Sequence, residues 1–104
     1  MSNRIAPRKI KRLPVTFISG NEECTGTSSD FSTTGLFIRT RKALPSGTSI
    51  KIIVELDDSH TITLTGIVVR AIKTGSMDIK NGMGVKLTSI PQEYQDFINK
   101  LIQS

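Results

Sequence analysis

The clearest structural signal in this chain of 104 residues is the stretch Ile62-Thr63-Leu64-Thr65-Gly66-Ile67-Val68-Val69-Arg70. Its alternating pattern is typical of a β-strand that turns one face toward a core. One face carries Ile62, Leu64, Gly66, Val68 and Arg70, and the other carries Thr63, Thr65, Ile67 and Val69. Gly66 in the middle indicates a bulge or a sharp bend, which a sheet needs where it curls into a barrel.

Shorter strand-like stretches lie on both sides of this strand, and turn signals such as Gly20-Asn21 separate them. Ile50, Ile52 and Val54 point one way along one of them, with Ile53 opposite. The other strands are predicted over residues 13–19, 22–31, 35–40 and 82–87. The chain is therefore expected to form six antiparallel strands.

The hydrophobic period changes after the last strand. Pro91 suits a first helical turn. The apolar residues then follow the spacing of an amphipathic helix, predicted over about 91–103, with the stripe Tyr94, Phe97, Ile98, Leu101 and Ile102. This stripe is expected to pack on the sheet or to plug a barrel end, and a dimer interface is its alternative role.

Six strands and one helix predict a mostly-β domain over residues 13–104. Because closing the sheet hides its edges, we expect a six-stranded antiparallel, Greek-key-like β-barrel with a C-terminal α-helix. No apolar run approaches the ~20 residues of a transmembrane helix, so membrane insertion is not expected. The single cysteine, Cys24, excludes an internal disulfide, and no secretory signal is evident, which favours the cytoplasm.

The net charge of +5 is concentrated in residues 1–12. This segment holds five of the 14 lysines and arginines and none of the nine acidic residues, so the rest of the chain is balanced. The five are Arg4, Arg8, Lys9, Lys11 and Arg12. We expect a flexible basic arm that meets an anionic partner, although a merely solubilising tail is the alternative.

Two short motifs indicate what that partner is. Arg8 and Arg12 form an RxxxR pair, whose planar guanidinium groups can pair with guanine O6 and N7 or with a phosphate.

Asp30, Ser32 and Gly35 form a DxSxxG motif at a corner between two predicted strands. Asp30 can accept hydrogen bonds from the N1–H and N2–H₂ edge of guanine, and Gly35 lets a ligand approach its backbone. A purely local turn is the alternative for DxSxxG. Together the motifs favour a nucleotide-binding module.

Three segments in order resemble a PilZ domain: residues 8–15 (Arg-Lys-Ile-Lys-Arg-Leu-Pro-Val), 30–37 (Asp-Phe-Ser-Thr-Thr-Gly-Leu-Phe) and 82–87 (Gly-Met-Gly-Val-Lys-Leu). The resemblance extends over nearly the whole chain, including the helix after the last strand. PilZ domains are bacterial receptors for cyclic di-GMP, built as a six-stranded antiparallel barrel with a flanking C-terminal helix. The resemblance thus implies this fold and this ligand, with no cofactor and no metal.

The resemblance also implies roles for particular residues. Arg8 and Arg12 match the pair that grips guanine Hoogsteen edges and phosphates, while Asp30, Ser32 and Gly35 match the surface that receives a guanine. The ligand would bridge these two groups and fold the arm onto the barrel. An effector protein, which the sequence does not identify, would read the changed surface.

The residue just before RxxxR indicates how many ligand molecules each domain binds. Family members that bind a stacked ligand pair have an extra arginine there, and this chain has Pro7. One ligand per domain is therefore expected, unless Arg4 or Lys9 substitutes. The protein is expected to be a monomer or a weak dimer.

Two other kinds of binding protein share some of these features. One is a PilZ-like adaptor that binds a protein and no nucleotide, against which the two intact motifs argue. The other is a small barrel for single-stranded nucleic acid, which would use exposed aromatic side chains. Besides Tyr94 the chain has four phenylalanines, of which Phe17 and Phe97 are expected in the core and Phe31 and Phe37 beside the corner.

An enzyme is not expected. The single histidine, His60, lies beside Asp57 and Asp58 in a predicted polar hairpin, and no cysteine is near enough in sequence to suggest a metal site. No nucleophile–base pair is evident, and no phosphate-binding glycine loop is followed by a helix. The sequence therefore predicts a binding protein.

Overall fold

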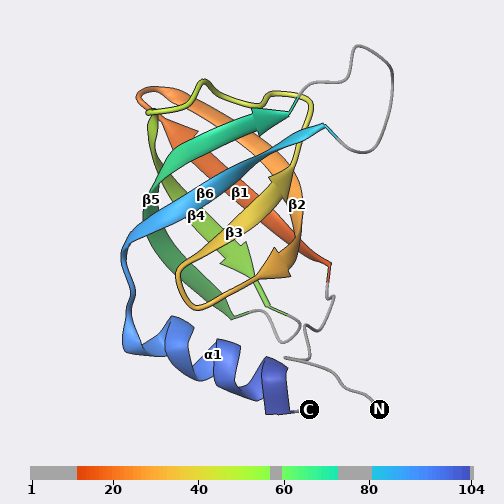
Figure 1. Cartoon of the computed structure of the whole chain (residues 1–104), viewed down its shortest axis with the longest axis vertical. Coiled ribbons are helices and arrows are strands. Elements are labelled where there is room, and N and C mark those ends of the chain that lie inside the picture. Colours follow the sequence, from red (N-terminus) through yellow and green to blue (C-terminus); the bar gives the residue numbers. More distant parts are fainter. Residues whose placement is uncertain (1–11, 57–59, 73–80, 104) are drawn as a thin grey trace.

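A computed structural model describes residues 12–56, 60–72 and 81–103. Figure 1 shows six strands wrapped around a common interior, with one helix across an end of the barrel. The elements are β1 (Leu13–Ser19), β2 (Glu22–Phe31), β3 (Gly35–Arg39), β4 (Ser49–Glu55), β5 (Thr61–Ile72), β6 (Gly82–Ser89) and α1 (Gln92–Gln103). The predicted arm before Arg12, most of the hairpin at 57–60 and most of the polar loop at 73–81 lie outside the described residues.

The strands form a closed barrel in the order β1-β2-β3-β6-β5-β4. Neighbouring strands are antiparallel throughout, and β1 pairs with β4 to complete the circle. The chain runs through β1, β2 and β3, crosses to β4, and returns through β5 to place β6 beside β3. The expected mostly-β barrel with a C-terminal helix is confirmed.

The core is built from alternate positions of the strands. Ile50, Ile52 and Val54 of β4 are buried as the pattern predicts, and Ile53 is only half-buried. The helix completes this core, because Tyr94 and Ile98 are fully buried members of it and Phe97 packs against them. The apolar stripe of α1 thus covers the barrel end, one of the two positions expected for it.

The pairing of β5 with β6 is irregular at two places. At the first, Thr65 pairs with Ser89 and Gly66 with Leu87, so the extra residue lies in β6. A Cβ on Gly66 would come within 2.7 Å of Val85 Cγ1 and 2.8 Å of the Lys86 carbonyl oxygen. The irregularity predicted at Gly66 is confirmed, with its extra residue in the partner strand. The second lies between Val68 and Arg70 and inserts an extra residue, so Arg70 is exposed. The expectation that Arg70 shares the inward face of the strand is therefore wrong, because alternation cannot show where a bulge reverses it.

A further bulge lies near the end of β2. Ser28 pairs with Ile38, whereas Asp30 pairs with the adjacent Phe37, so β2 contains one extra residue. The extra residue reverses the alternation: Ser28 is buried, Asp30 is turned to the outer face, and Phe31 enters the core. There the Phe31 ring meets that of Phe97 edge to face, with centroids 5.3 Å apart. Phe31 was expected beside the corner, and the structure places it in the core instead.

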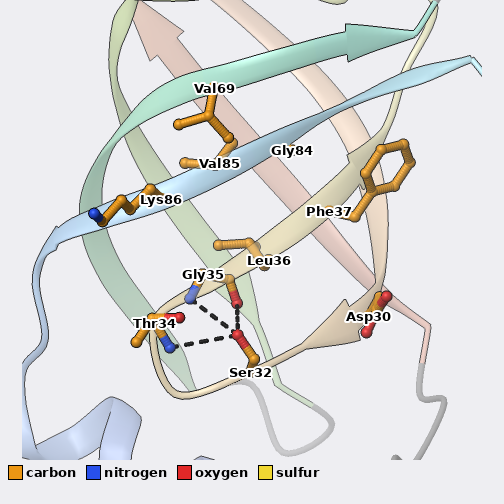
Figure 2. Close-up of a pocket in the computed structure, with 10 residues that line it drawn as sticks. All are labelled: Asp30, Ser32, Thr34, Gly35, Leu36, Phe37, Val69, Gly84, Val85 and Lys86. Carbon is orange, nitrogen blue, oxygen red and sulfur yellow. Dashed lines mark hydrogen bonds between the residues drawn. The ribbon is translucent and has the colours of Figure 1, made fainter.

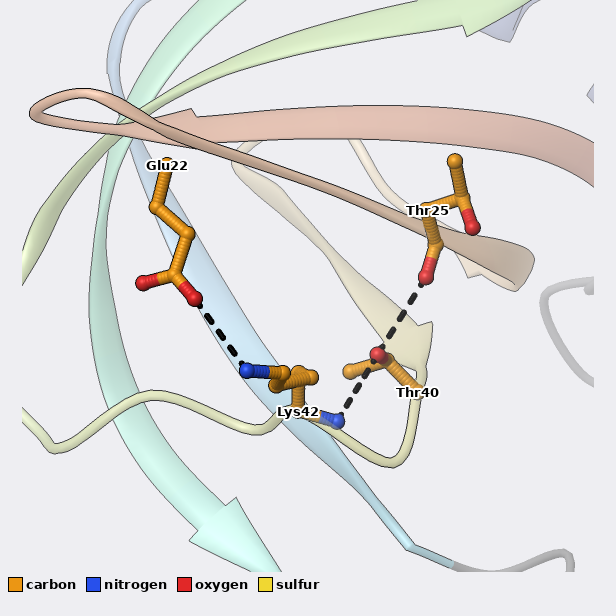
Figure 3. A network of polar contacts seen from close by, with 4 residues as sticks. All are labelled: Glu22, Thr25, Thr40 and Lys42. Carbon is orange, nitrogen blue, oxygen red and sulfur yellow. Dashed lines mark hydrogen bonds and ion pairs between the residues drawn. The ribbon is translucent and has the colours of Figure 1, made fainter.

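Polar contacts join the loop after β3 to the β1–β2 hairpin (Figure 3). Lys42 Nζ lies 3.1 Å from Glu22 Oε2, and the Thr40 hydroxyl donates to the Thr25 carbonyl at 3.3 Å. The Glu22 carboxylate raises the pKa of Lys42. Because both members of the ion pair are exposed, it contributes little to stability and mainly fixes the path of the loop.

Candidate functional site

An open depression of about 310 Å³ lies on the outer face of β3, β6 and β5, beside the β2–β3 turn (Figure 2). It is lined by Asp30, Ser32, Thr34, Gly35, Leu36, Phe37, Val69, Gly84, Val85 and Lys86. All three residues of the DxSxxG motif are in this set. The structure therefore brings the motif to the edge of a surface that a flat ligand can reach.

The floor of the depression is open because Gly84 has no side chain. A Cβ built there would have Val69 Cγ2 at 3.9 Å and the Arg70 Cβ at 4.0 Å as its nearest neighbours, which are ordinary contacts. The half-buried Phe37 of β3 lies on one side of this floor, and Val69 of β5, which is 54% exposed, lies on another. This apolar platform is suited to a planar ring.

Charged side chains of opposite sign lie at two sides of the platform. Asp30 is on the outer face at the end of β2, where the bulge places it, and Lys86 extends from β6 on the other side (Figure 2). Lys86 pairs with Gly35 across the strands, which puts its backbone beside the motif. The site thus offers a carboxylate for hydrogen-bond donors and a cation for an anionic group.

The Ser32 side chain holds the β2–β3 turn together. Its hydroxyl donates to the Gly35 carbonyl at 3.2 Å and accepts the Gly35 N–H at 3.2 Å and the Thr34 N–H at 3.4 Å. The Ser32 N–H also donates to the Gly35 carbonyl, at 2.9 Å. These bonds match the local-turn alternative, in which a serine hydroxyl replaces missing backbone partners.

Gly35 is required by the packing of two strands. A Cβ at this position would collide with the Val85 carbonyl oxygen of β6. Among the described glycines, the left-handed conformation occurs at Gly20 and Gly47, so Gly35 has no unusual φ. Its missing side chain therefore allows β3 to approach β6, and Gly35 also lines the depression, so its contact with a ligand stays a prediction.

Tyr94 links α1 to the same turn. Its hydroxyl donates to the Ser32 carbonyl at 2.7 Å and also lies 3.3 Å from the Gly35 carbonyl. The side chain is fully buried, and burial raises the pKa of the Tyr94 hydroxyl well above its usual range, so it stays protonated as a donor. The sequence pattern placed Tyr94 in the apolar stripe, and the period of a helix cannot reveal what its hydroxyl meets.

The RxxxR pair is partly within the described residues. Arg12 is exposed and directly precedes β1. Because Leu13 pairs with Ser28, Arg12 lies next to the end of β2 that carries Asp30. Arg8, Arg4 and Lys9 lie outside the described residues, and their contact with the ligand stays a prediction.

Sequence reasoning assigned no ligand contact to the platform residues Phe37, Val69 and Gly84, nor to Lys86 beside them. Phe37 had been placed beside the corner, but no role as a platform followed from that position. The signal in the sequence is the alternation of each strand, which places these residues on the outer face of the sheet. Alternation shows that they share one surface only when the strand order β3-β6-β5 is also known.

Within the described parts of the chain, no three His, Cys, Asp or Glu residues come together in a way that could hold a metal ion. His60 is exposed, and Cys24 is a half-buried free thiol. None of the helical residues described forms a segment long and apolar enough to span a membrane.

Comparison with known proteins identifies the family. The PilZ domain family model matches residues 2–104. This chain belongs to the PilZ family. Its fold resembles the PilZ domain of YcgR from Escherichia coli with c-di-GMP (TM-score 0.70, 13% identity, 98% of this chain and 90% of that one). It also resembles the PilZ domain of CeSA from a cellulose-synthesizing bacterium (TM-score 0.66, 19% identity, 93% and 95%).

The Bacillus subtilis inhibitor of motility MotI/DgrA also has this PilZ fold (TM-score 0.76, 21% identity). The match covers 99% of this chain but 51% of that one, so this PilZ chain spans about half the length of MotI. A search of curated protein sequences gave no match. At these identities the solved structures establish the fold, and the function has to be argued from the site.

Proposed function

We propose that this PilZ protein is a cyclic di-GMP receptor whose ligand lies on the depression between Asp30 and Lys86. The observation that supports this most strongly is the open apolar platform at Gly84, which adjoins all three DxSxxG residues. Membership of the PilZ family and the c-di-GMP complex of the YcgR domain agree with it. The residues at the platform bind and orient a ligand, and the proposal includes no catalytic step.

The chemistry of the ligand suits the distribution of groups. A guanine ring on the platform would cover Gly84 between Phe37 and Val69, and its N1–H and N2–H₂ edge would donate to the Asp30 carboxylate. The two phosphates would attract Lys86 and the arginines of the RxxxR motif. Ser32 would contribute indirectly, because its hydroxyl holds the turn that carries the motif.

The arm supplies the proposed signal. Binding would bring Arg8 and Arg12 over the depression and order residues 1–12 along the barrel, which changes the outer surface beside β2 and β3. An effector protein would recognise that changed surface. The position of Arg12 beside the Asp30 end of β2 supports this route, since the arm leaves the barrel next to the site.

Calorimetric titration with cyclic di-GMP tests the proposal. Asp30→Ala and Arg12→Ala should each weaken binding by about 1.5–3 kcal/mol, because each removes a charge-assisted hydrogen bond. Glu55→Ala and Lys51→Ala are matched controls, since they remove exposed charges from β4, on the opposite wall of the barrel, and should leave the affinity unchanged.

Competing ligands test the specificity of binding in the same titration. GTP and a short single-stranded RNA should bind weakly, and RNA binding should fall steeply with added salt. The absence of binding to the folded protein would contradict the receptor and favour an adaptor that recognises protein alone. Equal affinity for the RNA would favour the nucleic-acid-binding barrel.

A further inference from the structure

The β2–β3 turn is held from two sides by elements far apart in sequence. On the outside, the Ser32 hydroxyl bonds within the turn. On the inside, the Tyr94 hydroxyl of α1 donates to the Ser32 carbonyl at 2.7 Å, across 62 positions of sequence. Because the carbonyls of Ser32 and Gly35 converge on this hydroxyl, the shape of the turn depends on where α1 lies.

The burial of the Tyr94 side chain restricts where its hydroxyl group can lie. Its ring is fully enclosed and lies against that of Phe97, with centroids 6.1 Å apart, so the hydroxyl has a fixed position. If the donor is lost, the buried carbonyl oxygen has no hydrogen-bond partner, and this raises the free energy of the folded state. A shift of α1 would therefore have to move the turn or break this bond.

On the solvent side, the turn and the helix are separated by a groove. The groove has a volume of about 290 Å³ and is lined by Thr33, Thr34, Ile90, Gln95 and Asn99. This space leaves room for α1 to shift relative to the turn. The buried hydrogen bond of Tyr94 therefore holds the two elements in register.

We propose that Tyr94 is a positioning residue for the ligand site, and that through it the docking of α1 and occupation of the depression stabilise each other. The inference rests on the proposed cyclic di-GMP site for its ligand. Coupling of this kind is reciprocal: if the docked helix strengthens binding, bound ligand must strengthen the docking of the helix by the same factor. Helix α1 is then the element in which binding can be sensed away from the depression.

The positioning role is tested first without ligand, by amide hydrogen exchange followed by NMR. In Tyr94→Phe, the amides of Ser32 and Gly35 should exchange about tenfold faster than in the wild type, relative to barrel amides such as Ile52. Ile98→Val is the matched control, because it loosens a buried contact of the same helix and leaves the hydroxyl in place. Equal behaviour of the two variants, or an unchanged turn in Tyr94→Phe, would overturn the proposal.

The coupling is tested second, with cyclic di-GMP. Tyr94→Phe should bind about fivefold to tenfold more weakly than the wild type, and Ile98→Val should bind within about twofold of it. Saturating ligand should also slow amide exchange throughout α1 of the wild type, a measurement that needs no variant. Unchanged affinity in Tyr94→Phe together with unchanged exchange in α1 would refute the coupling.

The two experiments separate the two proposals. If the wild type does not bind cyclic di-GMP at all, the proposed function fails and with it the coupling to that ligand. The ligand-free exchange rates of Ser32 and Gly35 then still decide whether Tyr94 positions the turn.

Discussion

Gly35 and Gly84 of the site lack a side chain for different structural reasons. At Gly35 a side chain would collide with the β6 backbone, whereas at Gly84 it would meet only ordinary contacts and would occupy the depression. The first glycine serves the packing of the strands. The second leaves a surface open, which is the more direct mark of a binding site.

Substitution separates these two roles. Gly84→Val should leave the free energy of unfolding nearly unchanged and should weaken cyclic di-GMP binding by at least about tenfold, because its branched side chain covers the platform. Gly35→Ala should lower the free energy of unfolding by about 1–3 kcal/mol, because β3 and β6 must move apart. Urea denaturation and calorimetry together check both. Full affinity in a folded Gly84→Val protein would show that the ligand does not lie there.

The buried hydroxyl of Tyr94 predicts how the free energy of unfolding changes with pH. Its folded-state pKa is raised above the ordinary 10.0, so the folded protein holds this proton more tightly than the unfolded chain. The stabilising contribution is complete below about pH 10 and is lost as the pH rises further, at no more than about 1.4 kcal/mol per pH unit.

The difference in unfolding free energy between the wild type and Tyr94→Phe should therefore shrink above about pH 10. Because the chain has one tyrosine, its ultraviolet absorbance reports directly on this hydroxyl. Tyrosinate should appear together with unfolding. Its appearance at ordinary pH in the folded protein would show that the hydroxyl is not buried as described.

The bulge in β2 is the element on which the site depends most. One extra residue between Ser28 and Asp30 lets Phe31 enter the core while Asp30 faces outward. With regular alternation, Asp30 would share the buried side of Ser28. A carboxylate in an apolar barrel without a partner is strongly unfavourable.

Deletion of Ser29 should therefore destabilise the protein by several kcal/mol, because it removes the extra residue and turns either Asp30 inward or Phe31 outward. Ser29→Ala keeps the backbone count and serves as the control. Far-ultraviolet circular dichroism and urea denaturation measure the effect. A deletion variant as stable as the control would contradict the role given to the bulge.

Strands and helix could be predicted from the sequence wherever the pattern is regular. The alternation in β4 and the helical period of α1 were sufficient, and Gly66 indicated the irregular pairing of β5 with β6. The extra residues in β2 and β5 could not be predicted, since Ser29 and Val69 differ in no visible way from other strand residues. The positions of Phe31 and Arg70 were wrong for that reason.

At the level of the whole molecule, the barrel order creates a site that no single segment contains. The platform combines Phe37 of β3, Gly84 of β6 and Val69 of β5, strands that are neighbours in space but not consecutive in the chain. The sequence motif therefore located the edge of the site, and the opposite side with Lys86 required the pairing of β3 with β6.

The most direct measurement is an NMR titration of the isotope-labelled protein with cyclic di-GMP. Binding on the proposed surface should shift the backbone amides of Asp30, Gly35, Phe37, Gly84 and Lys86, while those of Lys51 and Ile53 on the opposite wall stay in place. Shifts concentrated on β4, or an unchanged spectrum at saturating ligand concentration, would contradict a cyclic di-GMP site on this face of the barrel.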